Sequence, residues 1–92
     1  MSYRYEFTPK ARVTLRKLAC RNPQAARAVI RKIEWLAGHA NDVAHRPIEG
    51  SPFFSLHSGP LRIPYLLDVA NQRIIIDDIA QHDAAYDRIN KL

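Results

Sequence analysis

Hydrophobic and polar residues alternate with a period of two at the start of the chain. Tyr3, Tyr5 and Phe7 are separated by charged residues, which predicts a strand with its aromatic side chains turned inward. Thr8 and Pro9 then supply an N-cap hydroxyl and a proline at the first helical position. The next apolar residues recur at helical spacing and predict a first helix ending near residue 20: Ala11, Leu15 and Leu18.

The same start signal recurs at Asn22 and Pro23 and predicts a second, longer helix. Its apolar stripe consists of Ala26, Val29, Ile30, Ile33, Leu36 and Ala37. Gly38 is well placed as the residue that follows the helix, where a positive φ is needed. Because the link between the helices is very short, we expect them to form a helical hairpin.

The second half of the chain has the composition of loops and strands. Residues 39–52 are predicted to be a loop, because asparagine, glycine and proline interrupt the pattern. Three strand-like runs follow, with turns between them: Phe53–His57, Leu61–Leu67 and Arg73–Ile79. Residues 84–92 are predicted to form a short C-terminal helix. The expected fold class is α+β in the order β-α-α-β-β-β. It is a helical hairpin packed on a small, mainly antiparallel four-stranded sheet, in one domain over residues 1–92.

The predicted hairpin of the second and third strands suggests where chemistry could lie. A turn centred on Gly59 and Pro60 places His57 opposite Arg62. Alternation then gives a core face with Phe54, Leu56, Ile63 and Tyr65, and an opposite face with Ser55, His57 and Arg62. The opposite face is either a functional surface or an ordinary solvated one. Pro64 lies inside a strand and indicates an edge strand or a local distortion.

The charge of the chain is positive and unevenly distributed. The 92 residues carry a formal net charge of +5, from 14 Lys and Arg against 9 Asp and Glu. Residues 4–32 hold nine of these cations against Glu6, whereas residues 68–87 hold five aspartates against Arg73. Such asymmetry indicates a basic face for nucleic acid or an acidic partner. The alternative is that the charge serves solubility alone.

Several classes of protein are not favoured by the sequence. No apolar run reaches membrane-spanning length, no signal-peptide core follows Met1, and the single Cys20 suits a reducing cytoplasm. Phosphate-loop, dinucleotide and serine-hydrolase motifs are absent. We expect no metal site, because the spacing of the histidines matches no zinc pattern: His39, His45, His57 and His82. Trp35 is interpreted as packing or cover, with a base-stacking role as the alternative.

Six segments, taken in order, resemble the RelE branch of the RelE/ParE toxin superfamily. They are Tyr5–Ala11, Ile30–Leu36, Arg46–Pro52, the strand pair Phe54–His57 and Leu61–Tyr65, and Ile79–His82 with Tyr86. The resemblance covers nearly the whole chain. It implies a cytoplasmic toxin of a type II toxin–antitoxin pair, acting as a ribosome-dependent mRNA endonuclease. It also implies a cognate antitoxin that blocks the toxin, and contact with operator DNA through that antitoxin.

The chemistry of such an endonuclease sets the residues that are needed. The RNA 2′-OH attacks the adjacent phosphate, a base removes its proton, an acid protonates the leaving oxygen, and cations stabilise the phosphorane. No metal or cofactor is required. The candidates are Arg62 as phosphate clamp, His82 as acid or base, His57 as the second acid or base, and Tyr86 as support or stacking group. The expected RNA contacts are Arg46, Lys10 and Arg31.

The sequence departs from the family pattern at four motif positions. Ser55 and His57 stand where many relatives have arginine, Glu49 stands where many have lysine, and His82 stands where many have arginine. Two other functions therefore stay open. One is a ParE-like gyrase inhibitor, although such chains generally have a longer helical hairpin and a basic tail. The other is a catalytically degenerate member that acts as an antitoxin-binding module.

Overall fold

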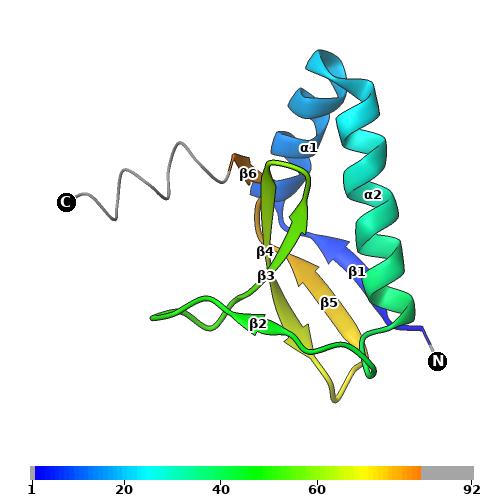
Figure 1. Cartoon of the computed structure of the whole chain (residues 1–92), viewed down its shortest axis with the longest axis vertical. Coiled ribbons are helices and arrows are strands. Elements are labelled where there is room, and N and C mark those ends of the chain that lie inside the picture. The colour runs from blue at the N-terminus through cyan, green and yellow to red at the C-terminus, as the bar shows by residue number, and fades with distance from the viewer. Residues whose placement is uncertain (1, 82–92) are drawn as a thin grey trace.

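The computed structural model describes residues 2–81, which form one sheet and a helical hairpin that covers one of its faces (Figure 1). The elements are β1 (Arg4–Phe7), α1 (Pro9–Arg21), α2 (Pro23–Gly38), β2 (Arg46–Pro47), β3 (Phe54–Ser58), β4 (Leu61–Asp68), β5 (Arg73–Ile76) and β6 (Ala80–Gln81). The helix predicted for residues 84–92 lies outside the described residues. The predicted α+β class and the predicted helical hairpin are confirmed.

The sheet is mixed, with the strand order β1-β5-β4-β3-β2. β1 runs parallel to β5, and all the other strand pairs are antiparallel. The four predicted strands are present, and the two-residue strands β2 and β6 extend the sheet. β2 falls in the segment that was predicted to be a loop. β5 ends at Ile76, three residues before the predicted end, and β6 pairs with β4 beyond it.

The polar caps predicted from the sequence start both helices. Thr8 Oγ1 accepts a hydrogen bond from the Ala11 amide at 3.1 Å, and Asn22 Oδ1 accepts one from the Ala25 amide at 3.1 Å. The Asn22 amide also donates to the Leu18 carbonyl at 2.7 Å. Asn22 therefore closes α1 and opens α2, which explains why the hairpin needs no longer link.

The predicted end of α2 is wrong in one respect. Gly38 is the last helical residue and is not among the described residues that have a positive φ. His39 ends the helix instead, with φ −125° and its amide bonded to the Leu36 carbonyl at 3.1 Å. The His39 Nδ1 atom lies 2.7 Å from the Trp35 carbonyl oxygen. Because this side chain reaches a terminal carbonyl, no left-handed residue is needed there.

The core lies between the hairpin and the covered face of the sheet. Its fully buried side chains come from both layers: Ala11, Val29, Ile33, Leu36, Ile63, Tyr65, Ile74 and Ile76. Tyr3 is also buried, as predicted for the inward face of β1. Leu56 and Ile63 are paired in the predicted register, and both belong to this core. The predicted two-residue turn is confirmed, because Gly59 has φ +58° between the paired Ser58 and Leu61.

Pro64 lies in β4 at the centre of the sheet, so the distortion that was predicted is present but the edge strand is not. The Asp77 amide donates to the Pro64 carbonyl at 2.9 Å, while proline has no amide to donate in return. The Asp77 carbonyl accepts from Thr8 Oγ1 at 2.9 Å instead. Beyond this point, two residues of the partner segment oppose Ile63, which is a β-bulge between β5 and β6.

This arrangement predicts a coupling between Thr8 and Pro64. Thr8→Val removes the helix cap and the donor to Asp77, so we expect the free energy of unfolding to fall by about 2 kcal/mol. Pro64→Ala restores a backbone donor toward Asp77. Its own cost should therefore be about 1 kcal/mol smaller in the Thr8→Val background than in the wild type. Urea unfolding of the wild type, the two single variants and the double variant measures this coupling. Purely additive effects would contradict the idea that the Thr8 hydroxyl takes the place of the amide that Pro64 lacks.

Candidate functional site

Ser55, His57 and Arg62 lie together on the sheet face opposite the helices, as the predicted register requires. His57 and Arg62 are directly paired across β3 and β4. The Arg62 Nε–H group donates to Ser55 Oγ at 3.2 Å, along the diagonal of the same face. Ser55 is only 9% exposed, whereas His57 is exposed. The buried hydroxyl thus fixes the guanidinium on one side, and Arg62 remains half-exposed beside the imidazole.

Arg46 joins this face from the neighbouring strand. β2 pairs with β3 so that Arg46 is opposite Ser55 and Pro47 is opposite Phe54. Directly paired residues project to the same side of a sheet, so Arg46 lies on the face of Ser55, and Arg62 lies on that face as the diagonal neighbour of Ser55. Two arginines on one face, on either side of Ser55, suit the binding of phosphate groups.

A groove follows the edge of β3 beyond the end of β2, between this strand and α2. It consists of two clefts of about 450 and 220 Å³, and Lys32, Trp35 and His57 line both of them. Arg31 lines the first cleft and Arg46 lines the second. Among the residues that the structure describes, no acidic residue lines either cleft. The fold therefore brings three cations from α2 and β2 to the strand edge that carries His57.

The sequence did not single out Lys32 for this groove. The signal was available, because Ala28, Lys32 and Trp35 recur at helical spacing on the face that lines it. Trp35 is 45% exposed, its ring stacks on His39 with the centroids 4.8 Å apart, and Lys32 Nζ lies 5.1 Å from its ring centroid. The interpretation of Trp35 as surface cover fits these contacts.

The remaining predicted site residues lie elsewhere or outside the described residues. Lys10 is the second residue of α1 and forms an ion pair with Asp78 at 3.4 Å, and it lines neither cleft of the groove. His82 and Tyr86 lie outside the described residues. Gln81, the residue before His82 in the sequence, is paired with Leu61 next to Arg62.

A chain of buried polar groups holds the segment that leads to Arg46. The His45 Nε2 atom lies 2.7 Å from the Ala40 carbonyl oxygen, so Nε2 must carry the proton that it donates. His45 Nδ1 then accepts the hydrogen bond of the Tyr65 hydroxyl. Tyr65 is 1% exposed, and burial raises its pKa to about 12, so it remains a donor at neutral pH. Neither residue was predicted to have this role, because a separation of 20 positions hides the contact in the sequence.

Tyr65→Phe should destabilise the fold through this chain. The substitution leaves His45 Nδ1 without its donor, and we expect a loss of about 1–2 kcal/mol in the free energy of unfolding. Tyr5→Phe is the matched control, because the Tyr5 hydroxyl makes only an exposed bond to Glu34 at 3.3 Å. Thermal melts of both variants at neutral pH measure the difference, and equal melting temperatures would contradict a structural role for this chain.

Alkaline pH should lower the stability of the fold through the same residue, Tyr65. Its pKa is about 12 in the folded protein against an ordinary value of 10, so the unfolded chain releases the proton first. The stabilisation is complete below pH 10 and is lost as the pH rises from 10 toward 12. We expect the stability of the wild type to fall more steeply over this window than that of Tyr65→Phe. Urea unfolding across the window tests this, and parallel curves would assign the alkaline loss to other groups.

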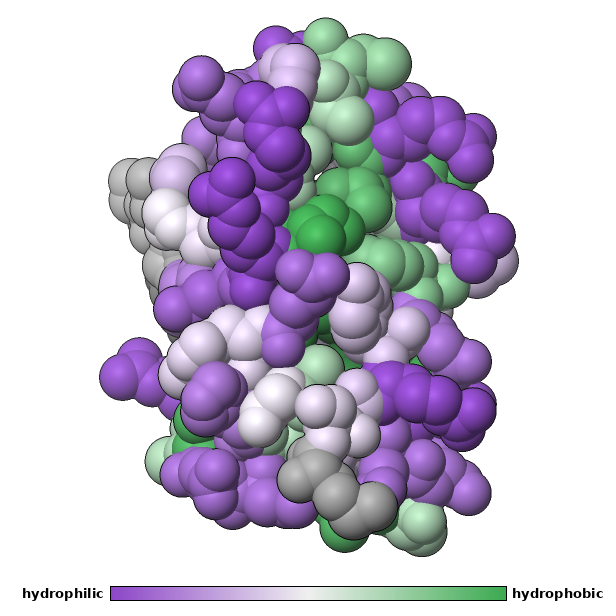
Figure 2. All heavy atoms as spheres, turned by 90° about the vertical axis from the view of Figure 1, so that its right-hand side faces the viewer, coloured by the Kyte–Doolittle hydropathy of each residue, from purple (hydrophilic) through white to green (hydrophobic). Residues whose placement is uncertain are grey.

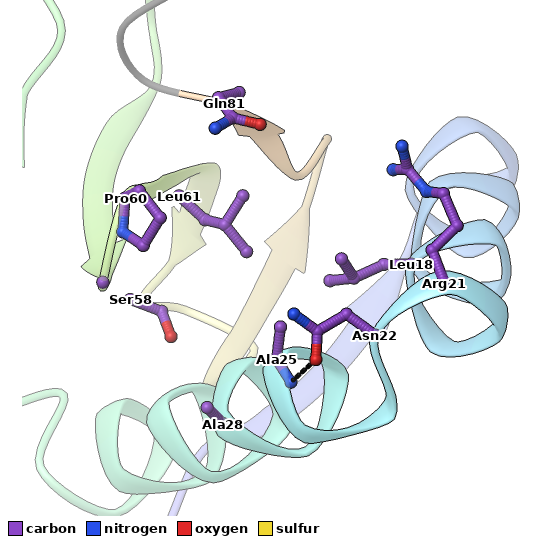
Figure 3. A pocket seen from close by; sticks show the side chains of 10 residues that line it. Leu18, Arg21, Asn22, Ala25, Ala28, Ser58, Pro60, Leu61 and Gln81 are labelled. Atoms are coloured by element: carbon purple, nitrogen blue, oxygen red, sulfur yellow. Dashed lines mark hydrogen bonds between the residues drawn. The ribbon is translucent and has the colours of Figure 1, made fainter.

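A separate cleft, of about 400 Å³, lies between the link that joins the two helices and the turn of the β3–β4 hairpin (Figure 3). Leu18, Ala25 and Leu61 line it together with Arg21 and Asn22. The Asn22 side chain is already occupied as the cap of α2. Among the described residues, this cleft is lined by one cation, Arg21, and by no histidine, whereas His57 and three cations line the groove along β3.

The fold was compared with known proteins. No family model and no curated protein matches the sequence. Among solved structures, the RelBE2 toxin–antitoxin complex of Mycobacterium tuberculosis matches with a TM-score of 0.74 and 24% identity, over 88% of this chain and 92% of that chain. The chain has the fold of the RelE/ParE toxins. The free RelE toxin mutant of E. coli matches with a TM-score of 0.73 and 16% identity, over 92% of this chain and 88% of that chain.

The matching structures include members of both the RelE branch and the ParE branch. The chromosomal ParDE toxin–antitoxin system of P. aeruginosa matches with a TM-score of 0.68 and 20% identity, over 87% of this chain and 96% of that chain. Similarity at this level establishes the shared fold and does not choose between the branches. No helix among the described residues has the length and the apolar character to cross a membrane.

Proposed function

We propose that this protein is the toxin of a type II toxin–antitoxin pair and that it cleaves mRNA on the ribosome in the cytoplasm. The observation that carries the proposal is the gathering of Arg46, Arg62 and His57 on one sheet face, next to a groove with Arg31 and Lys32. Such a surface suits a polyanion that must be held while one phosphate reacts. The RelE/ParE fold supports the same function.

The proposed reaction is transfer of the phosphate from the 5′ oxygen to the 2′ oxygen of the same RNA strand. A base takes the proton of the 2′-OH, and that oxygen forms a bond to the phosphorus. The bond to the 5′ oxygen breaks, and an acid protonates this leaving oxygen. His57 and His82 supply the base and the acid, Arg62 binds the phosphate, and Tyr86 supports the site. Arg46, Arg31 and Lys10 contact the RNA further away. The reaction requires no metal or cofactor.

The structural similarity to a ParE-containing complex gives a reason to consider a second function. A ParE-like toxin would bind gyrase and would not cut RNA, and the match to the ParDE system supports this alternative as the RelE match supports cleavage. A catalytically degenerate chain would keep its antitoxin but lose toxicity. The serine at position 55 supports the histidine-based cleavage over the degenerate module, because its hydroxyl orients Arg62 beside His57.

Inducible expression distinguishes these functions. We expect growth arrest together with mRNA cuts that are phased with codons, mapped by the 5′ ends of a reporter transcript. His82→Ala should abolish both effects at an equal protein level. Arrest with induction of DNA damage and intact mRNA would indicate gyrase instead. Normal growth would indicate the binding module.

A further inference from the structure

Trp35 lies where the two clefts of the groove along β3 meet, because its side chain lines both of them. Its exposed fraction is 45%, although tryptophan is highly buried on average. Among the described residues, only Val13 and Val69 are other large apolar side chains that are exposed. Neither of these valines lines the groove. Contact with its neighbours therefore leaves nearly half of Trp35 open, at a place where charged side chains gather.

The indole ring of Trp35 is held in place by residues one turn away from it. The His39 ring stacks on it, with the centroids 4.8 Å apart and the two planes at 20° to each other. His39 is itself fixed, because its Nδ1 atom lies 2.7 Å from the Trp35 carbonyl oxygen. Lys32 approaches from the preceding turn, with its Nζ atom 5.1 Å from the ring centroid. A ring that is already fixed loses little conformational freedom when another flat group stacks on it.

The cations around Trp35 restrict its ligand. Arg31 and Lys32 line the first cleft, and Lys32 and Arg46 line the second, while no acidic residue among those described lines either one. The side of the molecule on which α2 lies is largely hydrophilic outside a strip in the middle of its upper half (Figure 2). A ligand that covers the indole must therefore combine a flat apolar face with negative charge close beside it.

A single strand of nucleic acid has both properties. Every base has a π face and is attached to a phosphate, and single strands are bound by aromatic rings that stand in basic grooves. A duplex keeps its bases stacked on one another, so it has no free face for Trp35. An acidic protein segment would satisfy the cations, but its carboxylates have no face that could stack on the indole. The combination of ring and cations therefore favours an unpaired base.

We propose that Trp35 is a stacking platform for an unpaired RNA base, in a nucleotide close to the phosphate that Arg46 and Arg62 bind. The base replaces the Lys32 ammonium at the indole, and this ammonium moves on its flexible stem to the phosphate of the same nucleotide. That the strand is the mRNA under attack rests on the proposed function, whereas the stacking does not. A purine covers more of the indole than a pyrimidine does, so the platform should favour purines.

Fluorescence tests the platform directly, because Trp35 is the only tryptophan in the chain. The probe is a 2′-O-methyl oligoadenylate of about six nucleotides, which has no 2′-OH to attack its phosphates. The comparison strand has the same phosphates but abasic sugars. We expect the oligoadenylate to quench Trp35 and to bind about tenfold more tightly than the abasic strand, with an oligouridylate between them. Equal quenching and equal affinity for the abasic strand would overturn the proposal, and so would stronger quenching by a polyglutamate peptide.

Variants separate stacking from charge when the strands carry a dye and anisotropy measures their binding. Trp35→Leu should lower the affinity for oligoadenylate to that for the abasic strand, whereas Lys32→Ala should weaken the binding of both strands alike. Val69→Ser is the matched control, because Val69 is 61% exposed and lines neither cleft, and it should bind like the wild type. A preference for oligoadenylate that survives in Trp35→Leu, or an equal loss in Val69→Ser, would contradict stacking on this ring.

The cuts made in cells separate this inference from the proposed function. Under that function, Trp35→Leu should cut mRNA more slowly and should lose a purine preference at one fixed position beside the cut. An unchanged pattern of cuts would overturn the assignment of the platform to mRNA. If the wild type cuts no mRNA, the proposed function fails, whereas the oligoadenylate titration still decides whether Trp35 stacks on a base.

Discussion

Arg62→Ala should reduce the rate of mRNA cleavage by about 10²–10³-fold, because one well-placed donor to a charge-rich transition state contributes on that scale. Arg62 is held by Ser55 Oγ at 3.2 Å and is paired with His57 across the hairpin. Its loss removes both a positive charge and a fork of donors that matches phosphate. Single-turnover cleavage of mRNA in programmed ribosomes measures the rate, apart from binding and from cell growth.

Two further variants make this test specific. Arg12→Ala removes an exposed arginine of α1 and should leave the rate within about twofold, because exposed charges at a distance are screened by salt. Arg62→Lys keeps the charge but loses the planar fork, so it should fall between Arg62→Ala and the wild type. Equal losses in Arg12→Ala and Arg62→Ala would mean that total charge, and not this site, governs the reaction.

Ile74→Ala should be the most destabilising of the simple core substitutions. Ile74 is fully buried on β5, where it faces the helical hairpin. Truncation of such a side chain removes apolar contact and leaves a cavity, at a cost of about 2–5 kcal/mol. The total free energy of unfolding of a domain of this size exceeds that cost by only a few kcal/mol. We therefore expect a large fall in the urea midpoint and a low yield of folded protein.

Ile75→Ala is the matched control for this prediction. Ile75 is the next residue of the same strand, points to the opposite face, and is only partly buried. The same chemical change should therefore cost about 1 kcal/mol. A similar loss at both positions would contradict the two-layer architecture, in which the helices cover one face of the sheet.

The elements with strong local signals could be predicted from the sequence. The N-caps at Thr8 and Asn22 place both helices, because proline and a polar cap specify a helix start by local chemistry. The Gly59 turn fixes the register of β3 and β4, so the juxtaposition of His57 and Arg62 followed from counting residues. The fold class and the sheet face of the candidate site were therefore accessible.

Three features of the structure were not predicted. The end of α2 at His39 depends on a side chain that reaches the Trp35 carbonyl, whereas the prediction relied on a glycine with a positive φ. β2 is only two residues long and exists because β3 offers it a partner. The placement of Lys32 beside His57 depends on how α2 crosses the sheet edge. The last two contacts join residues that packing brings together, whereas the His39 contact spans only four residues.

The parallel pairing of β1 with β5 has a consequence for the biosynthesis of the protein. Phe7 is paired with Ile76, so the first strand finds its neighbour only after 69 further residues have been made. At roughly 5–20 residues per second, that interval lasts about 3–14 s, and the exit tunnel prolongs it. The nascent chain thus cannot complete its sheet until Ile76 has been made and has left the exit tunnel. Under the proposed function, the toxin lacks its complete sheet over this interval, so a partner has several seconds in which to meet it first.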